Sequence, residues 1–141
     1  NLLVDVVGVE SIRKCLEELR IDGIVMLRGV QDEAAFQAGI NNLVTANGVL
    51  RLLRMIADGR AYSPEVCAQM LEIMLDTRAR SGIPAGVPGD ASVAHKPGNI
   101  STVHHDAGIV FAERPYVLVV LVRGIQEQKE SAALIAAEGK A

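Results

Sequence analysis

The sequence predicts an α/β fold of the α+β type, in which helices come first, a three-stranded antiparallel meander follows and one helix ends the chain. Apolar residues recur at helical spacing before position 80, and short β-type runs follow position 91. A glycine- and proline-rich segment, residues 82–89, separates the two patterns. We therefore expect one partial domain over residues 1–141, mainly helical in 1–80, with the sheet and the last helix in 81–141.

The first part should contain four helices. Gly8 interrupts the first apolar run, and Thr45 is a capping residue at the start of a later one. Ser63-Pro64-Glu65 combines a serine cap, a proline at the first helical position and an acid in the first turn. Residues 24–42 show no regular period. The expected helices cover residues 1–7, 11–20, 45–57 and a run that follows Ser63.

The second part should contain the sheet. Its glycines and prolines predict that residues 82–89 form a loop and no helix. The connections between the following apolar runs are short, which favours antiparallel neighbours. The expected elements are strands at about residues 91–96, 104–111 and 116–123 and a helix over residues 126–138, ended by Gly139.

The composition excludes several classes of protein. Half of the residues are hydrophobic, 22% are charged, and the net charge is −3. These values fit an ordinary globular chain with one core, and they offer no basic surplus to attract nucleic acid. Aromatic residues make up only 3%, so the core must be aliphatic. The longest apolar run, residues 116–122, is far shorter than the roughly 20 residues of a membrane helix.

Two cysteines, Cys15 and Cys67, lie in apolar helical patterns. A free cysteine in such a setting behaves as a small hydrophobic residue, so we expect two buried thiols. A disulfide between them stays open, because pairing cannot be deduced from sequence.

One motif stands out, a lysine in an apolar, glycine-containing strand, Val93-Ala94-His95-Lys96-Pro97-Gly98-Asn99. A second strand, His105-Asp106-Ala107-Gly108-Ile109-Val110, follows closely. The motif resembles the Lys-Thr-Gly box of the penicillin-recognising serine hydrolases, with proline at the threonine position. The flanking segments, residues 83–88 and 115–121, are also similar to those of class A β-lactamases.

The start of the chain extends this resemblance. Asn1-Leu2-Leu3-Val4-Asp5-Val6-Val7-Gly8 resembles a helix that in class A enzymes follows the Ser-x-x-Lys and Ser-Asp-Asn motifs. The resemblance therefore implies the second half of a β-lactamase fold, with both motifs outside these 141 residues. A Ser-x-x-Lys match inside the chain, Ser11-Ile12-Arg13-Lys14, sits where a helix should begin, so we expect Ser11 to act as a cap.

The resemblance also implies roles for the lysine box. Lys96 would supply positive charge to the site, Gly98 would permit close approach of substrate, and the Asn99 N–H would form half of an oxyanion hole. Pro97 would stand where a threonine hydroxyl binds the substrate carboxylate, and it offers neither a hydroxyl nor an N–H. An edge strand would tolerate this proline. The alternative for Lys96 is a solvated lysine that protects a strand edge.

The deacylation base is not assigned by the sequence. In the family, a glutamate in the Ω loop activates the water, and an ungapped count back from Thr45 reaches Gly29. The nearest acids are Asp32 and Glu33, and Glu33 is followed four residues later by Gln37 instead of asparagine. We expect both acids to be solvated or to lie at the start of a helical turn over residues 34–38.

Three histidines, His95, His104 and His105, invite a metal or triad hypothesis. His104 and His105 are adjacent on an expected strand and would point to opposite faces, so they cannot chelate an ion together. A packing role for His105 and Asp106 is favoured instead. No metal site and no cofactor are expected.

The resemblance implies a parent protein that forms an acyl-enzyme with a β-lactam or a peptidoglycan-like amide or ester, with a role in antibiotic resistance or β-lactam catabolism. Such a parent would be periplasmic or secreted, and this chain alone should be inactive. A non-catalytic or slowly deacylating penicillin-binding-like module is the alternative, and an unrelated α/β binding domain is a third. The residues 116–122 strand would leave an apolar edge unpaired, which predicts self-association.

Overall fold

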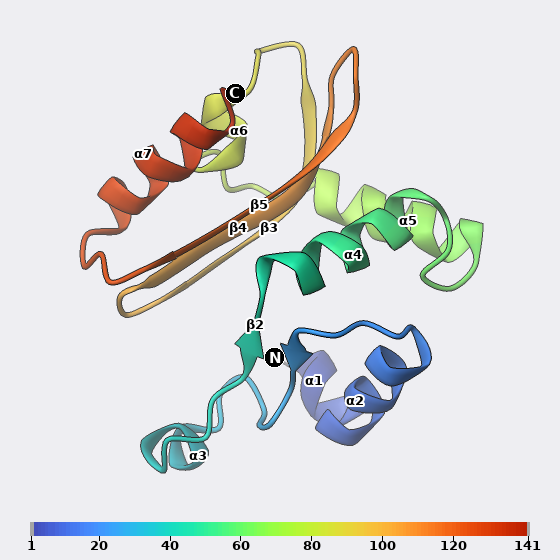
Figure 1. Cartoon of the computed structure of the whole chain (residues 1–141), viewed down its shortest axis with the longest axis vertical. Helices are drawn as coiled ribbons and strands as arrows, with labels where there is room; N and C mark the ends of the chain where they lie inside the picture. Colours follow the sequence, from blue (N-terminus) through green and yellow to red (C-terminus); the bar gives the residue numbers. More distant parts are fainter. Residues whose placement is uncertain (1, 141) are drawn as a thin grey trace. The chain divides into compact units, whose positions relative to one another are not determined.

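The computed structural model describes residues 2–140 and shows two compact units, Asn1–Arg51 and Leu52–Ala141. Each unit has its own hydrogen-bonded elements (Figure 1). Helix α4 (Ala46–Ala57) contains the point at which the units are divided, and it begins and ends close to where the sequence predicts. Within residues 2–140, no helix is long and apolar enough to cross a membrane.

The first unit holds short elements. Helices α1 (Leu2–Val7) and α2 (Val9–Glu18) meet at Gly8, whose φ of 81° is the left-handed conformation that glycine adopts readily. This confirms the predicted break. Ser11 lies inside α2, and Gly8 occupies the N-cap position without a side-chain hydrogen bond. The prediction that Ser11 caps the helix is therefore wrong, because α2 begins two residues earlier than the apolar period indicates.

Residues 24–42, expected to be irregular, contain two elements. Strand β1 (Ile24–Val25) pairs antiparallel with β2 (Leu43–Val44). The segment between them is therefore a loop whose two ends are held together by this pairing, and we call the paired ends the neck of the loop. Helix α3 (Glu33–Gln37) lies within that loop.

The start of α4 is tied to the same neck. The Gly48 N–H donates to Thr45 Oγ1 at 3.1 Å, which confirms the predicted cap. A Cβ at Gly48 would lie 2.6 Å from the backbone oxygen of Asp22. The glycine in the first turn of α4 thus lowers helix propensity but permits close backbone contact with the turn before β1.

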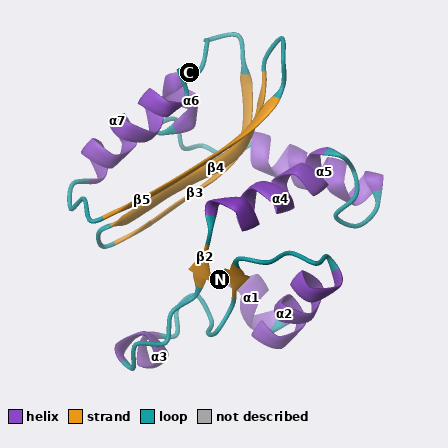
Figure 2. Ribbon diagram, in the orientation of Figure 1, coloured by secondary structure: helices purple, strands orange, loops and turns teal. Residues whose placement is uncertain are grey.

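The second unit is a layered arrangement of helices and one sheet. Antiparallel strands pair in the order β3-β4-β5, with α5 on one face and α6 and α7 on the other (Figures 1 and 2). This confirms the predicted order of helices, three-stranded meander and final helix. The elements are α5 (Pro64–Leu75), α6 (Ile83–Gly86), β3 (Ser92–Ile100), β4 (Val103–Phe111), β5 (Tyr116–Arg123) and α7 (Gln128–Glu138).

Helix α5 shows how the local sequence sets an element boundary. Ser63 Oγ accepts a hydrogen bond from the Val66 N–H at 3.3 Å, and Pro64 occupies the first turn. The backbone N–H of Glu65 and the Ser63 hydroxyl donate to the Glu65 carboxylate, and these bonds lower its pKa below the ordinary value. The capping signal read from the sequence is therefore confirmed atom by atom.

Helix α6 corrects the expectation that residues 82–89 contain no helix. Gly82, with φ of 81°, precedes it, and Pro84 lies in its first turn, where the missing N–H costs no hydrogen bond. A Cβ at Gly86 would overlap the backbone oxygen of Ala136, so this glycine lets α6 and α7 pack closely. Glycine and proline here permit a tight helical turn rather than preventing one.

The core of the second unit is aliphatic, as the composition predicts. It lies between the sheet and the α6–α7 layer, and burying each large aliphatic side chain contributes about 1.5–3 kcal/mol. Cys67 is buried as a free thiol, whereas Cys15 is free and exposed, so the prediction of two buried thiols is wrong for Cys15. The core residues are Ile83, Val93, Val110, Val122 and Ile135.

Candidate functional site

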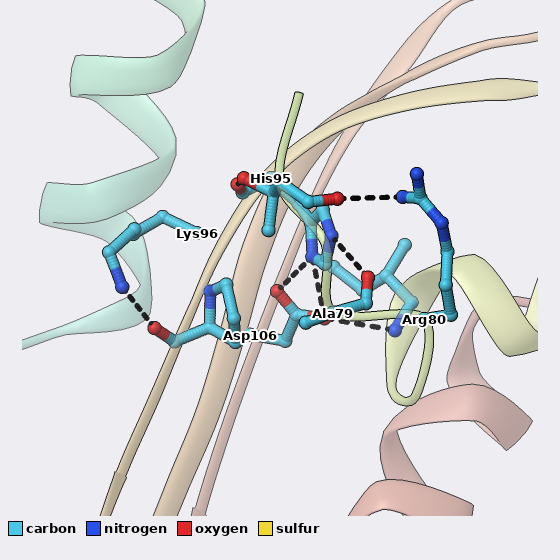
Figure 3. Close-up of polar contacts among 8 residues, drawn as sticks. Ala79, Arg80, His95, Lys96 and Asp106 are labelled. Atoms are coloured by element: carbon cyan, nitrogen blue, oxygen red, sulfur yellow. Dashed lines mark hydrogen bonds and ion pairs between the residues drawn. The ribbon is translucent and has the colours of Figure 1, made fainter. Parts of the chain in front are cut away.

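Lys96 lies in the middle of β3, which is an edge strand of the three-stranded sheet. It pairs with Ala107 of β4, and its side chain is exposed. The Nζ amine donates to the Pro97 carbonyl oxygen at 2.5 Å. Because successive strand residues face opposite sides, Lys96 and His95 project in opposite directions (Figure 3). The lysine is thus an accessible cation on a regular strand.

The three residues after Lys96 continue the strand. Pro97 lies on the edge strand β3 and pairs with Asp106 of β4. An edge strand tolerates a residue without an N–H, as the sequence predicts. Gly98 has no atom within 4 Å of the position that a Cβ would occupy. Asn99 is exposed near the end of the strand. This stretch therefore presents open space at Gly98 beside the exposed Lys96 amine.

Behind Lys96 lies a buried His–Asp contact that the sequence does not indicate. His95 Nδ1 lies 2.9 Å and 3.1 Å from the two carboxylate oxygens of Asp106, and both side chains are buried. Asp106 Oδ2 also accepts a hydrogen bond from the Ile83 N–H at 3.0 Å. The pair is shown in Figure 3. A packing role was expected for Asp106, and the structure buries its side chain against His95 of the neighbouring strand.

His104 and His105 point to opposite faces of β4, as predicted. His104 is buried, and its Nδ1 lies 2.6 Å from Ser131 Oγ on α7. His105 Nδ1 accepts a hydrogen bond from the Val122 N–H at 3.1 Å. Across residues 2–140, no group of three His, Cys, Asp or Glu side chains is arranged to hold a metal ion.

The two acids considered for the Ω loop, Asp32 and Glu33, lie at the start of α3. Asp32 is its N-cap and accepts from the Ala35 N–H at 3.0 Å. Glu33 Oε1 accepts from Gln37 Nε2 at 2.7 Å, one helical turn away. Both carboxylates therefore contribute to the local structure of the loop.

The protein family to which the sequence belongs agrees with this geometry. The family profile described as "Beta-lactamase enzyme family" matches residues 1–141. The chain belongs to the β-lactamase enzyme family. No curated protein sequence matches it.

Solved structures with the same fold include PBP-A and several β-lactamases. PBP-A superposes with a TM-score of 0.83 at 24% identity, over 94% of this chain and 49% of PBP-A. A β-lactamase from Chitinophaga pinensis gives 0.85 at 23% identity, over 98% and 55%. A β-lactamase from Sphaerobacter thermophilus gives 0.83 at 21% identity, over 99% and 54%. This chain of the β-lactamase family thus spans about half the length of these relatives.

The sequence of this β-lactamase family chain also does not indicate the Asn42 clamp, a set of hydrogen bonds that joins the two ends of the loop between β1 and β2. Asn42 Oδ1 accepts from the N–H groups of Leu27 and Arg28 at 2.8 Å and 3.0 Å, and Asn42 Nδ2 donates to the Arg28 carbonyl at 3.1 Å. Arg28 also donates to the Ile40 carbonyl at 2.9 Å and lies over the Phe36 ring. No sequence period indicates such a clamp, because one side chain replaces a strand pairing.

We expect Asn42→Ala to loosen this loop, because it removes three hydrogen bonds, each worth about 0.5–1.5 kcal/mol. Limited proteolysis should cut between residues 26 and 42 at least several times faster than in the unchanged chain. The neighbouring Asn41 makes only one contact, to the Gly39 carbonyl at 3.3 Å, so Asn41→Ala is the matched control. Equal cleavage of the two variants would contradict the role of the clamp.

Proposed function

We propose that this chain is the second half of a β-lactamase-like serine hydrolase that forms an acyl-enzyme with a β-lactam or a related amide or ester. The single observation that carries the proposal is the exposed Lys96 amine on an edge strand, followed by the open position of Gly98. Family membership over residues 1–141 supports the same reaction class.

The chemistry assigns each residue of the strand a task. Acyl transfer requires positive charge near the nucleophile and the substrate carboxylate, and N–H groups aimed at the developing oxyanion. Lys96 would supply the charge, the Asn99 N–H would supply one oxyanion donor, and Gly98 would leave room for substrate to lie along β3. The nucleophilic serine would come from a Ser-x-x-Lys segment outside these 141 residues.

A slowly deacylating, penicillin-binding-like module is the second candidate, and two observations favour it. Pro97 has no hydroxyl with which to bind a substrate carboxylate. One oxygen of each of Asp32 and Glu33 is committed to a hydrogen bond at α3, and Glu33 has Gln37 four residues later where the family has asparagine. One structure similar to this chain is a PBP-A variant described as an acyl-enzyme complex with penicillin G, at 24% identity and a TM-score of 0.83.

Labelling with a fluorescent penicillin tests the proposal. The full-length product of the gene that encodes this chain should acquire a covalent label, and Lys96→Ala should slow labelling at least about 100-fold, as loss of one electrostatic contact to a transition state does. The exposed Lys129 of α7 supplies the control variant, Lys129→Ala. Turnover of nitrocefin after labelling separates the two candidates, because only the hydrolase releases its acyl group quickly.

Restoring the hydroxyl should improve the reaction. We expect Pro97→Thr to raise the acylation rate for β-lactams that carry a carboxylate by about 10-fold, because a hydrogen bond to a charged group is worth about 1.5–3 kcal/mol. Pro97→Val, which restores only the N–H, separates the hydroxyl from the backbone effect. A rate that is unchanged or lower in Pro97→Thr would contradict the assigned position of the carboxylate.

The proposed substrates also imply a location and a hazard. A parent that acts on β-lactams or peptidoglycan-like compounds would be periplasmic or secreted, where it could contribute to antibiotic resistance. Within the described residues, β5 pairs only with β4 and leaves one edge of the sheet without a strand partner. A chain of residues 1–141 alone would therefore self-associate through β5, and sedimentation at increasing concentration would detect it.

A further inference from the structure

The residue immediately before Lys96 is held by more contacts than its place in a strand requires. His95 is completely buried on the face of β3 opposite to Lys96. Its carbonyl oxygen accepts from Thr77 Oγ1 at 2.9 Å, and its Nε2 lies 3.2 Å from the Ala79 carbonyl oxygen. Together with the bonds to Asp106, these contacts anchor one residue to the neighbouring strand and to the segment between α5 and α6.

Both imidazole nitrogens of His95 face acceptors. Nδ1 faces the Asp106 carboxylate, and Nε2 faces the carbonyl oxygen of Ala79 (Figure 3). A carboxylate can only accept, so Nδ1 donates its N–H to Asp106, and Nε2 lies beside the Ala79 carbonyl oxygen. Asp106 also accepts a hydrogen bond from the Ile83 N–H at the start of α6. The pair is therefore a rigid connection between β3, β4 and α6.

Two glycines provide the space that the pair occupies. A Cβ at Gly108 would lie 2.6 Å from the His95 Cβ, and a Cβ at Gly82 would lie 2.6 Å from Asp106 Oδ2. Gly108 is directly opposite His95 in the strand register. The fold thus places small residues around a buried polar pair, at positions where larger side chains could have filled an apolar core.

The pair acts on the neighbouring residue through the backbone. One planar peptide unit joins His95 to Lys96, so holding the His95 backbone in place limits the movement of the Lys96 nitrogen and Cα, and the strand conformation of β3 then sets the direction of the Lys96 side chain. Among residues 2–140, the one polar contact of the Lys96 side chain is to the Pro97 carbonyl oxygen of its own strand. Its position therefore depends on the anchoring of β3 from behind.

We propose that His95 and Asp106 are positioning residues for Lys96, which hold its amine in the geometry required for acyl transfer. This inference rests on the proposed function, but the anchoring of the strand can be measured separately. The reacting groups must be held within a fraction of an ångström, because a displacement of about 1 Å can cost about 100-fold in rate.

The test compares three variants of the full-length gene product. His95→Ala removes the anchor, and His95→Asn keeps a donor for Asp106, because its amide nitrogen is bonded to Cγ as Nδ1 is. His104→Ala is the matched control, since it removes an equally buried histidine from the same face of the sheet, one that contacts Ser131 instead. Each variant is measured for its limiting acylation rate and its binding constant with a fluorescent penicillin, and for amide hydrogen exchange at Lys96 and Gly98.

We expect His95→Ala to lower the limiting acylation rate about 10- to 100-fold with the binding constant changed less than about threefold. His95→Asn should recover most of the acylation rate. His104→Ala should keep an acylation rate within about twofold of the unchanged protein, even where its melting temperature falls as far as that of His95→Ala. Equal rate losses in His95→Ala and His104→Ala, or no rescue by asparagine, would overturn the proposal.

Failure of the proposed function gives a different result. If the unchanged protein acquires no penicillin label, the acyl-transfer function is wrong, and hydrogen exchange alone decides whether the strand is anchored. Faster exchange at Lys96 and Gly98 in His95→Ala than in His104→Ala supports the anchor. Identical exchange in both variants overturns it.

Discussion

Replacing Asp106 with alanine should lower the free energy of unfolding by about 3–5 kcal/mol. The carboxylate is buried and accepts hydrogen bonds from His95 and from the Ile83 N–H, so its removal leaves a buried imidazole and a helix N–H without their partner. An uncompensated buried group costs far more than a surface ion pair contributes. Denaturant unfolding followed by circular dichroism measures the loss in the full-length gene product.

The exposed Asp90 provides the control for that change. Asp90→Ala is the same type of substitution, but it removes an exposed carboxylate from the loop before β3. It should change the free energy of unfolding by less than about 0.5 kcal/mol. A loss below about 1 kcal/mol in Asp106→Ala would contradict the buried contact of Asp106 with His95 and Ile83, because it would mean that water or another group satisfies both partners.

Two glycine-to-alanine changes on neighbouring strands should have opposite consequences. Gly108→Ala places a methyl group 2.6 Å from the His95 Cβ and 2.7 Å from the Ala94 carbonyl oxygen, so β3 and β4 must separate, at a cost of about 1–3 kcal/mol. Gly98→Ala meets no atom within 4 Å and should leave stability within about 0.5 kcal/mol. In the proposed site, the methyl group that Gly98→Ala adds lies where substrate approaches. Gly98→Ala should therefore slow acylation at least 10-fold.

Thermal unfolding and penicillin labelling of both variants check this contrast. Gly89, a loop position where a Cβ would also have no neighbour within 4 Å, supplies the control for alanine itself. If Gly98→Ala were labelled at the unchanged rate, substrate would not run along β3. If Gly108→Ala were as stable as Gly89→Ala, the close contact behind His95 would be refuted.

Strong local signals explain which elements could be predicted. The serine and proline before α5 specify its first turn, and β-branched runs with short connections specify the meander. Strands β1 and β2 are two residues long and therefore carry no period. Helix α6 was missed because proline and glycine were interpreted as helix breakers, although proline is favoured in a first turn.

The candidate site was predictable only along one strand. Lys96 and its successors form a continuous motif, so they could be identified from the chain alone. His95 and Asp106 meet through the register of β3 and β4, which depends on where the hairpin turns. A turn placed at Ser101 and Thr102 would have set both side chains on one face and indicated their contact. The clamp by Asn42 depends on a loop geometry that no spacing rule describes.

The acylated residue is the most direct test of the account. The full-length gene product is incubated with penicillin G, the adduct is weighed by intact-protein mass spectrometry, and its position is found by peptide mapping. The account predicts one adduct, on a serine of a Ser-x-x-Lys motif outside residues 1–141, that forms at least 100-fold more slowly in Lys96→Ala. An adduct on Ser11, an adduct that forms equally fast without the Lys96 amine, or no adduct at all would contradict it.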